Sequence, residues 1–115
     1  MSTDCLFCRI VAGEISVDRI YESETVIGFK DINPQAPIHV LFIPRKHIAT
    51  LNDADAADRA VLGDLLLAAR HYAAERGIAE DGFRVAMNCN RDGGQTVFHI
   101  HLHMLAGRSL SWPPG

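Results

Sequence analysis

The sequence predicts an α+β fold in which a mainly antiparallel sheet packs against one long helix. Short runs rich in β-branched and aromatic residues outnumber the helical stretches. Several of these runs are separated by brief turns, as in hairpins, and only residues 51–77 show sustained helical periodicity. The chain has 115 residues, of which 48% are hydrophobic, so we expect residues 1–115 to form one domain with a substantial core.

The first half of the chain contains one short helical segment and three expected strands. Residues 5–13 place apolar side chains at helical spacing before a glycine, which predicts a short helix or a pair of turns. Residues 19–22 and 26–30 are predicted strands joined by a polar turn, and residues 33–37 are a predicted loop because two prolines interrupt regular structure. Residues 39–44, with the sequence HVLFIP, are predicted to form the next strand.

Residues 51–77 form the predicted long helix. Asn52, Asp53 or Asp55 can cap its N-terminus, and Gly77 can end it. Its apolar side chains recur with the period of a helix that packs on a core, at Val61, Leu65, Ala68 and Tyr72. We expect this helix to serve packing and assign no chemistry to it.

The second half of the chain is predicted to end in two further strands. Residues 82–90 are one strand, residues 91–95 a glycine-rich loop, and residues 96–107 the last strand. The tail at residues 108–115 contains two adjacent prolines and is not expected to be regular.

The last predicted strand carries three histidines at alternate positions, in the sequence HIHLH. Alternate side chains of a strand lie on one face, so His99, His101 and His103 are predicted to share a face opposite apolar residues. Two imidazoles at that spacing can converge on a metal ion, and a neutral imidazole is also a nucleophile near neutral pH. Metal ligation and nucleophilic catalysis are therefore the two functional hypotheses, and a strand that happens to carry histidines is the third interpretation.

Attack of an imidazole on phosphorus would require donors for the phosphoryl oxygens and a proton source for the leaving group. Gly93 and Gly94 allow the backbone to approach an anion closely. The candidate side-chain donors nearby are Asn88, Gln95, Thr96 and the second imidazole, His103.

A second cluster of chemically active residues is the sequence CLFC near the N-terminus. Cys5 and Cys8 are three residues apart, so one helical turn brings both sulfurs to the same side and supplies half of a tetrahedral zinc site. Two histidines would have to complete such a site, and the candidates are His39, His47 and His99. A redox dithiol and a pair of inert buried cysteines are the alternatives.

Composition limits the classes of partner and location. The formal net charge is −3 and no stretch is densely basic, which disfavours nucleic acid as the main partner. The N-terminus does not resemble a signal peptide, and no apolar run approaches the ~20 residues that span a bilayer. Three cysteines without an export signal disfavour a disulfide framework. We therefore expect a cytoplasmic protein with no membrane partner.

Three segments together resemble the histidine triad superfamily, and in particular its Hint branch, the purine nucleoside phosphoramidases. The segments are DINPQAPIHVLFIPRKHI, MNCNRDGGQTVFHIHLHMLAGR and the closing WPPG, and the resemblance extends from about Cys5 to Gly115. It implies a five-stranded antiparallel sheet with one long and one short helix, and a homodimer with a ten-stranded sheet. It also implies hydrolysis of the P–N bond of purine nucleoside phosphoramidates, with aminoacyl-adenylates as a further substrate class and with release of AMP or GMP.

The resemblance assigns a role to individual residues of this chain. His101 would be the nucleophile that forms a nucleotidyl-histidine intermediate, the carbonyl of His99 would orient its ring, and His39 would hold or relay a proton behind the triad. The implied nucleotide-binding residues are Phe7, Phe29, Asp31, Ile32, Asn88, Gly94, Gln95, Thr96, His101 and His103, with Asp31 on the ribose. Leu6, Ile10 and Ile15 would extend the base pocket, and Trp112 would reach the active site of a partner subunit.

Members of the superfamily that carry the cysteine pair bind a structural zinc, and by resemblance its ligands here would be Cys5, Cys8, His47 and His99. No catalytic metal and no organic cofactor are implied. Thr96 stands where the Hint branch usually has serine, and threonine at this place also occurs in the Fhit branch, which cleaves dinucleoside polyphosphates. A Fhit-type hydrolase and a zinc-stabilised, nucleotide-binding regulatory scaffold are therefore the alternative functions.

Overall fold

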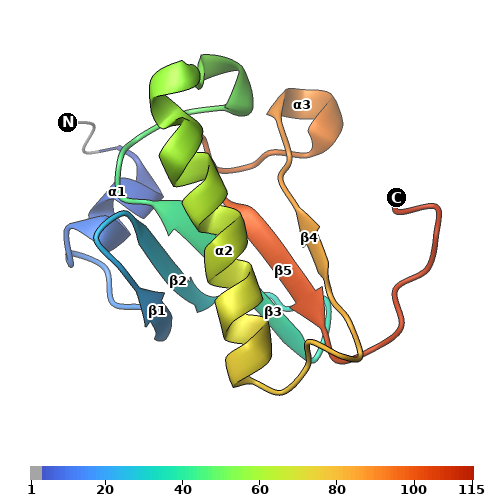
Figure 1. Cartoon of the computed structure of the whole chain (residues 1–115). Coiled ribbons are helices and arrows are strands. Elements are labelled where there is room, and N and C mark those ends of the chain that lie inside the picture. The colour runs from blue at the N-terminus through green and yellow to red at the C-terminus, as the bar shows by residue number, and fades with distance from the viewer. Residues whose placement is uncertain (1–3) are drawn as a thin grey trace.

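Five strands form one antiparallel sheet in the computed structural model, which describes residues 4–115. Their order across the sheet is β1-β2-β3-β5-β4, so β1 and β4 are the two edges (Figure 1). The strands are β1 (Arg19–Glu22), β2 (Val26–Lys30), β3 (Ile38–Pro44), β4 (Arg84–Ala86) and β5 (Leu102–Ala106). Every neighbouring pair is antiparallel, which confirms the predicted α+β class.

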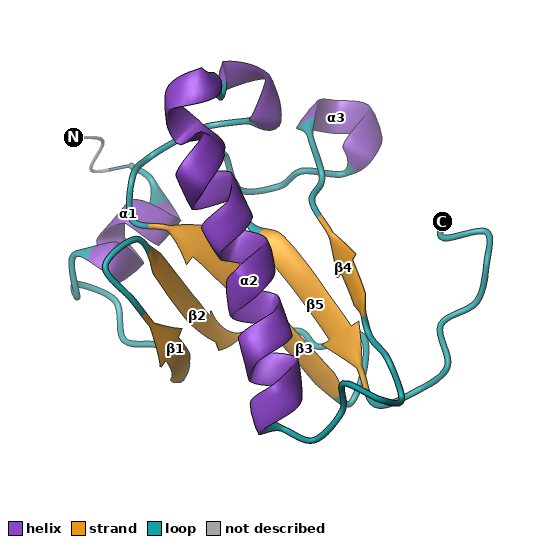
Figure 2. Ribbon diagram, in the orientation of Figure 1, coloured by secondary structure: helices purple, strands orange, loops and turns teal. Residues whose placement is uncertain are grey.

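Helices cover this sheet unequally. The long helix α2 (Arg59–Glu75) lies across one face, and the short helix α1 (Leu6–Val11) packs beside β2 and β3 (Figure 2). Alternation along the strands separates two clusters of buried residues: Val40 and Phe42 of β3 pack with α2, whereas Leu41 and Ile43 pack with α1. The two helices therefore lie on opposite faces, and side chains on the α1 face are free of the main core.

The N-terminal half agrees with the sequence prediction almost residue by residue. The strands predicted at 19–22 and 26–30 are confirmed, and the strand predicted at 39–44 begins one residue earlier. The N-terminal segment is a helix that the Cys5 side chain caps by accepting a hydrogen bond from the Cys8 N–H. Gly13 follows it with φ of 80°, a left-handed conformation that glycine adopts without a steric penalty.

The predicted helix at residues 51–77 is wrong in extent. Two 3-10 turns, Leu51–Asp53 and Ala56–Asp58, precede α2. Thr50 and Asp55 each form a capping box that closes one of these turns, so two local hydrogen-bonding arrangements compete with continuous helix. Asp55 caps the second 3-10 turn rather than α2, whose N-cap is Asp58, and Gly77 follows the helix with φ of 72° as predicted.

The C-terminal strands are also shorter than predicted. The strand expected at 82–90 is reduced to β4 at Arg84–Ala86. The loop expected at 91–95 is largely the one-turn helix α3 (Asn90–Gly93). The strand expected at 96–107 does not begin until Leu102, the first residue of β5. The chain bends at residues 97–99. The prediction that all three histidines lie in one strand is therefore wrong for His99 and His101, because only His103 lies in β5. His101 and His103 nevertheless line the same cavity, and Phe7 of α1 packs against both His99 and His101.

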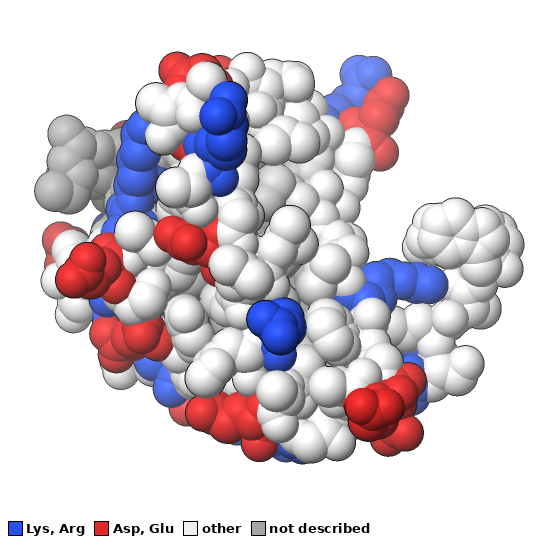
Figure 3. Space-filling model, in the orientation of Figure 1, with Lys and Arg blue, Asp and Glu red and all other residues white. Residues whose placement is uncertain are grey.

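Two surface features bear on the partners that the sequence disfavours, nucleic acid and membrane. No helix within residues 4–115 has the length and apolar character that crossing a bilayer requires. On the face that carries α2, basic and acidic side chains are interspersed and form no continuous basic surface (Figure 3).

Candidate active site and metal cluster

A cavity of about 420 Å³ opens on the α1 face of the sheet. This volume lies within the range of about 300–1,000 Å³ that is usual for small-molecule sites. It brings together most of the residues that the resemblance assigns to nucleotide binding, namely Phe7, Phe29, Asp31, Ile32, Thr96, His101 and His103. Leu6, Ile10 and Ile15 also line it.

Some lining residues were not anticipated from the sequence. Ser16, Val17, Lys30, Leu41 and Val97 also line this cavity. Leu41 could have been found from the alternation within residues 39–44, because it pairs with His103 across β3 and β5 and so lies on the same face. Ser16 and Val17 carry no such signal, because they belong to an irregular connection that only the tertiary fold brings to the cavity.

The His101 ring lines this cavity, and one of its two nitrogens is held by a backbone carbonyl. Its Nδ1–H donates to the backbone carbonyl of His99 at 2.9 Å, and since a carbonyl only accepts, the proton must be on Nδ1. The Nε2 atom of the neutral ring therefore keeps its lone pair. Burial lowers the pKa of His101 below the ordinary 6.5, so the neutral form predominates at neutral pH.

His103 is held in the opposite tautomer through His39. The Gln35 backbone N–H donates to His39 Nδ1 at 3.0 Å, so the proton of the neutral His39 ring is on Nε2. His39 Nε2 lies 3.0 Å from His103 Nδ1 and can donate to it, which leaves His103 with an N–H at Nε2. Burial, followed by the neighbouring imidazoles, lowers the pKa of His103 to about 4. The site thus places the unprotonated Nε2 of a neutral His101 near the Nε2–H of a neutral His103. The centroids of the two rings are 5.0 Å apart.

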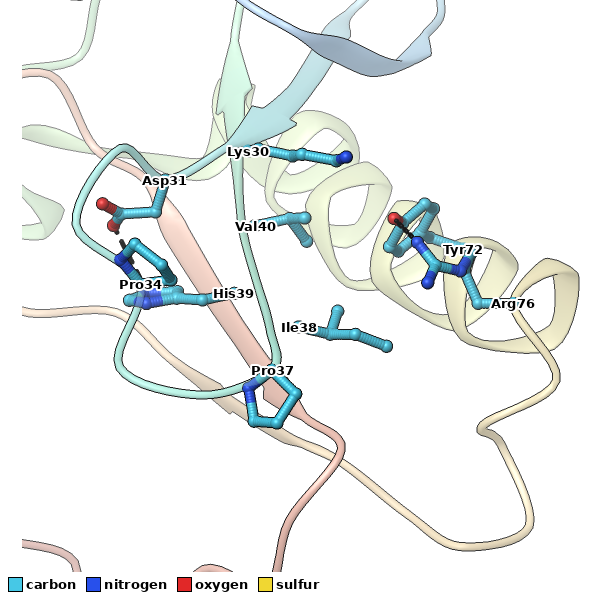
Figure 4. Close-up of a pocket in the computed structure, with 9 residues that line it drawn as sticks. All are labelled: Lys30, Asp31, Pro34, Pro37, Ile38, His39, Val40, Tyr72 and Arg76. Atoms are coloured by element: carbon cyan, nitrogen blue, oxygen red, sulfur yellow. Dashed lines mark hydrogen bonds and ion pairs between the residues drawn. The ribbon is translucent and has the colours of Figure 1, made fainter.

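Asp31 lies where the loop between β2 and β3 begins. One carboxylate oxygen accepts from the Asn33 N–H at 2.8 Å, and the other lies 3.4 Å from His39 Nε2 (Figure 4). The same loop is tied to the C-terminal tail, because the Arg108 guanidinium donates twice to the Gln35 carbonyl, at 3.0 and 3.3 Å. The backbone of Gln35 therefore contacts both Arg108 of the tail and His39, which in turn contacts His103.

Of the predicted phosphate donors in residues 88–96, some line the cavity and others do not. Both N–H groups of the buried Gln95 amide donate to backbone carbonyls, of Ala49 at 2.8 Å and of Val97 at 3.0 Å, so Gln95 holds the loop in place. The Gly94 N–H donates to Arg91, and Asn88 is outside the lining of the cavity. Thr96 is different: it lines the cavity, and neither its N–H nor its hydroxyl has a protein partner within residues 4–115. Direct contacts of Asn88, Gly94 and Gln95 with a phosphate stay predictions.

A cluster of Cys5, Cys8, His47 and His99 lies beside His101, with all four candidate ligand atoms within 4.8 Å of one another. The Nδ1 atoms of His47 and His99 are 3.3 Å apart, and Cys8 Sγ lies 3.2 and 3.5 Å from them. Tetrahedral zinc with two sulfurs and two nitrogens places its ligand atoms about 3.3–3.8 Å apart. His99 Nε2–H donates to the Pro44 carbonyl at 2.8 Å, which leaves its Nδ1 lone pair directed into the cluster. The donor set and its spacing therefore fit a tetrahedral metal ion, and the sequence alone could not choose among the three candidate histidines.

The cysteines of this cluster show no feature of a redox site. Both are buried free thiols. Burial and the neighbouring Cys5 raise the pKa of the Cys8 thiol to about 11, so without a cation it is protonated and unreactive at neutral pH.

A second, smaller cavity of about 180 Å³ lies at the end of the β2-β3 hairpin, toward α2 (Figure 4). Lys30, Ile38 and Val40 line it together with the loop, with Tyr72 of α2 and with Arg76, which directly follows α2. The Arg76 guanidinium donates to the Tyr72 hydroxyl at 2.8 Å. Its volume is below the range of about 300–1,000 Å³ for small-molecule sites.

Comparison with known proteins places these features in a family. The family model described as the HIT domain matches residues 12–110. The chain is 46% identical over 110 residues to the purine nucleoside phosphoramidase of Escherichia coli strain K12, which covers 96% of this chain and 92% of that protein. It is 50% identical over 115 residues to an uncharacterized HIT-like protein of Synechocystis sp., which covers the whole of both chains.

Solved structures with the same fold include a HIT family hydrolase from Legionella pneumophila. It superposes with a TM-score of 0.95 at 48% identity and covers 97% of this chain and 100% of that one. A histidine triad protein from Clostridium difficile superposes with a TM-score of 0.93 at 40% identity, and the match covers 96% of each chain. These similarities confirm the fold expected from the sequence.

Proposed function

Because this chain belongs to the HIT domain family, we propose that it is a hydrolase that cleaves the P–N bond of purine nucleoside phosphoramidates, with His101 as its nucleophile. The single observation that carries the proposal is the neutral His101 ring, whose Nδ1–H is fixed by the His99 carbonyl and whose free Nε2 lies on a cavity of suitable size. The similarity to a purine nucleoside phosphoramidase supports this choice of substrate.

The reaction proceeds in two displacements at the same phosphorus. His101 Nε2 attacks the α-phosphorus, an N–P bond to the ring forms, and the P–N bond to the amine breaks as that nitrogen takes a proton from water. Water then attacks the nucleotidyl-histidine, the bond to His101 breaks, and a nucleoside monophosphate leaves. The Nδ1–H of His101 stays on the His99 carbonyl throughout and stabilises the positive ring of the intermediate.

The remaining groups of the cavity bind the nucleotide. Thr96 and the Nε2–H of His103 are donors for the phosphoryl oxygens, and Asp31 accepts from the two ribose hydroxyls. The base lies against the apolar wall formed by Phe7, Phe29, Ile32 and their neighbours. His39 keeps His103 in the donor tautomer rather than touching the substrate.

Cys5, Cys8, His47 and His99 would hold a structural zinc ion. With four protein ligands the ion would have no open position for water or substrate, so it would supply a cross-link between the N-terminal turn and the sheet. Its ligand His99 differs from the nucleophile His101, and the chemistry stays with His101.

The test is to trap the intermediate. Wild-type protein mixed briefly with an adenosine phosphoramidate and quenched should carry one adenylyl group, and peptide mass spectrometry should map it to His101. The variant His101→Ala should lose at least about 10³-fold in turnover while retaining AMP binding, whereas His71→Ala, on the exposed side of α2, should behave as wild type.

Comparison of substrates separates the main alternative. Thr96 also fits the Fhit branch, so turnover of diadenosine polyphosphate should be measured beside that of the phosphoramidate. Near-normal activity of His101→Ala would exclude the covalent mechanism, and faster cleavage of the dinucleotide would replace the proposed substrate.

A further inference from the structure

One helical turn carries both the metal cluster and a wall of the active site. Cys5 and Cys8 direct their sulfurs to the cluster, and Phe7 lies between them in sequence. The Phe7 ring packs edge-on against two imidazoles, with its centroid 5.9 Å from that of His99 and 5.1 Å from that of His101. The position of this turn therefore decides how tightly the ring of His101 is held.

His99 is the second connection between the cluster and the nucleophile. Its Nδ1 belongs to the cluster, its Nε2–H donates to the Pro44 carbonyl, and its own carbonyl accepts from His101 Nδ1–H. The residue is fully buried. A ligand bond at Nδ1 therefore also restrains the backbone carbonyl that selects the tautomer of His101.

We propose that Cys5, Cys8 and His47 are positioning residues for the nucleophile, and that they act by fixing Phe7 and His99 when they share a metal ion with His99. The catalytic consequence rests on the proposed function, but the structural consequence does not. The metal is thus more than a general stabiliser: its presence determines whether the His101 ring is ordered in the reactive tautomer.

The short length of α1 makes this dependence physically reasonable. The helix has six residues, and isolated helices of that length are unstable in water. Within the protein, the contacts between its sulfurs and the imidazoles are 3.2–3.5 Å long and involve weak donors and acceptors. Ligand bonds at the same four atoms are far stronger, so metal occupancy should determine the order of the turn.

The test uses the full chain with the two cysteines replaced. Cys5→Ser with Cys8→Ser should lose its zinc, measured by atomic emission, and the matched control Cys89→Ser should retain it. In the double variant the Nδ1–H resonance of His101, which is protected while it donates to His99, should broaden or vanish in NMR spectra. The single-turnover rate of adenylyl transfer should fall about tenfold or more, with a smaller change in the Kd of AMP.

A second variant tests the route through Phe7. Phe7→Leu should retain zinc yet weaken the His101 resonance and lower the single-turnover rate, because leucine leaves part of the ring contact unfilled. A metal-free double variant with an unchanged His101 resonance and rate would overturn the proposal. If that variant does not fold, zinc should be removed from the wild-type chain with a chelator and then restored as Zn²⁺. The resonance should then disappear and return, and its persistence without zinc would be equally decisive.

These readouts also separate this proposal from the proposed function. A chain that shows the zinc-dependent resonance but forms no adenylyl adduct would disprove the hydrolase and leave the coupling intact.

Discussion

Backbone groups distinguish three histidines that are chemically identical. The Pro44 and His99 carbonyls fix protons on His99 Nε2 and His101 Nδ1, and the Gln35 N–H occupies His39 Nδ1. Each bond determines which nitrogen of its ring keeps a lone pair, which suits His99 to ligate a metal ion, His101 to act as a nucleophile and His39 to donate to His103. The functions of the triad are therefore set by main-chain geometry as much as by side-chain identity.

This arrangement predicts the pH dependence of the reaction. Burial lowers the pKa of His101, and the reactive ring is the unprotonated one. As pH falls, activity should therefore persist below the ordinary 6.5 and decline only when the buried ring gains a proton. A kcat/KM profile from about pH 8 to about pH 4 with adenosine phosphoramidate checks this. An acidic limb centred at or above 6.5 would show that His101 is more exposed to water than the structure indicates.

At the scale of elements, the pairing of β2 with β3 depends on one glycine. A Cβ atom at Gly28 would lie 2.8–2.9 Å from the Phe42 ring and 3.0 Å from Ile20. Gly28→Ala should therefore lower the free energy of unfolding by about 1–3 kcal/mol through overpacking. Urea denaturation followed by circular dichroism measures the change.

The control for this prediction is a glycine in α2. A Cβ at Gly63 meets nothing within 4 Å, so Gly63→Ala should raise stability by about 0.5–1 kcal/mol, because alanine favours helix. Equal effects of the two substitutions would contradict the assigned packing.

The sequence predicted correctly those strands whose ends are marked by nearby turn residues and whose course is not changed by contacts with distant segments. β1 and β2 were placed correctly because a polar turn marks their junction. The last strand was overestimated because HIHLH reads as an alternating strand, whereas Gln95 and the cluster at His99 bend the chain before Leu102. The turn of α3 was missed because a side chain beyond it, the Gln95 amide oxygen that accepts from the Asn90 N–H, helps to close it, and glutamine is not a turn signal.

The candidate site was predictable to a similar degree. Cys5 and Cys8 were recognisable from their spacing, but the choice of His47 and His99 over His39 came from resemblance and required the fold to bring distant segments together. The tautomers were not predictable, because they depend on carbonyls that carry no residue-specific signal. Gln95 illustrates the opposite case, since a residue type suited to phosphate is used here to hold the loop.

At the scale of the whole molecule, the sheet separates stability from chemistry. The face under α2 contains the larger apolar cluster, whereas the face under α1 carries the cavity, the imidazoles and the cluster of Cys5, Cys8, His47 and His99. Substitutions under α2 should therefore alter unfolding more than catalysis, and the α1 face can vary its polar groups without disturbing the main core.

The resemblance also predicts a dimer with a sheet of ten strands. Both β1 and β4 are edge strands in this chain, and a second copy could pair with one of these edges to extend the sheet. Sedimentation equilibrium should give about twice the chain mass of 12.6 kDa. A mass of 12.6 kDa at micromolar concentration would refute the predicted dimer.

The two bonds from Arg108 to the Gln35 carbonyl have a practical consequence for anyone who handles this protein. A purification tag fused after Gly115 would extend the tail that Arg108 holds against Gln35. The same Gln35 fixes the tautomer of His39 and, through it, that of His103. A tag at this end should therefore be cleavable, and kinetic constants measured before and after its removal should not be pooled.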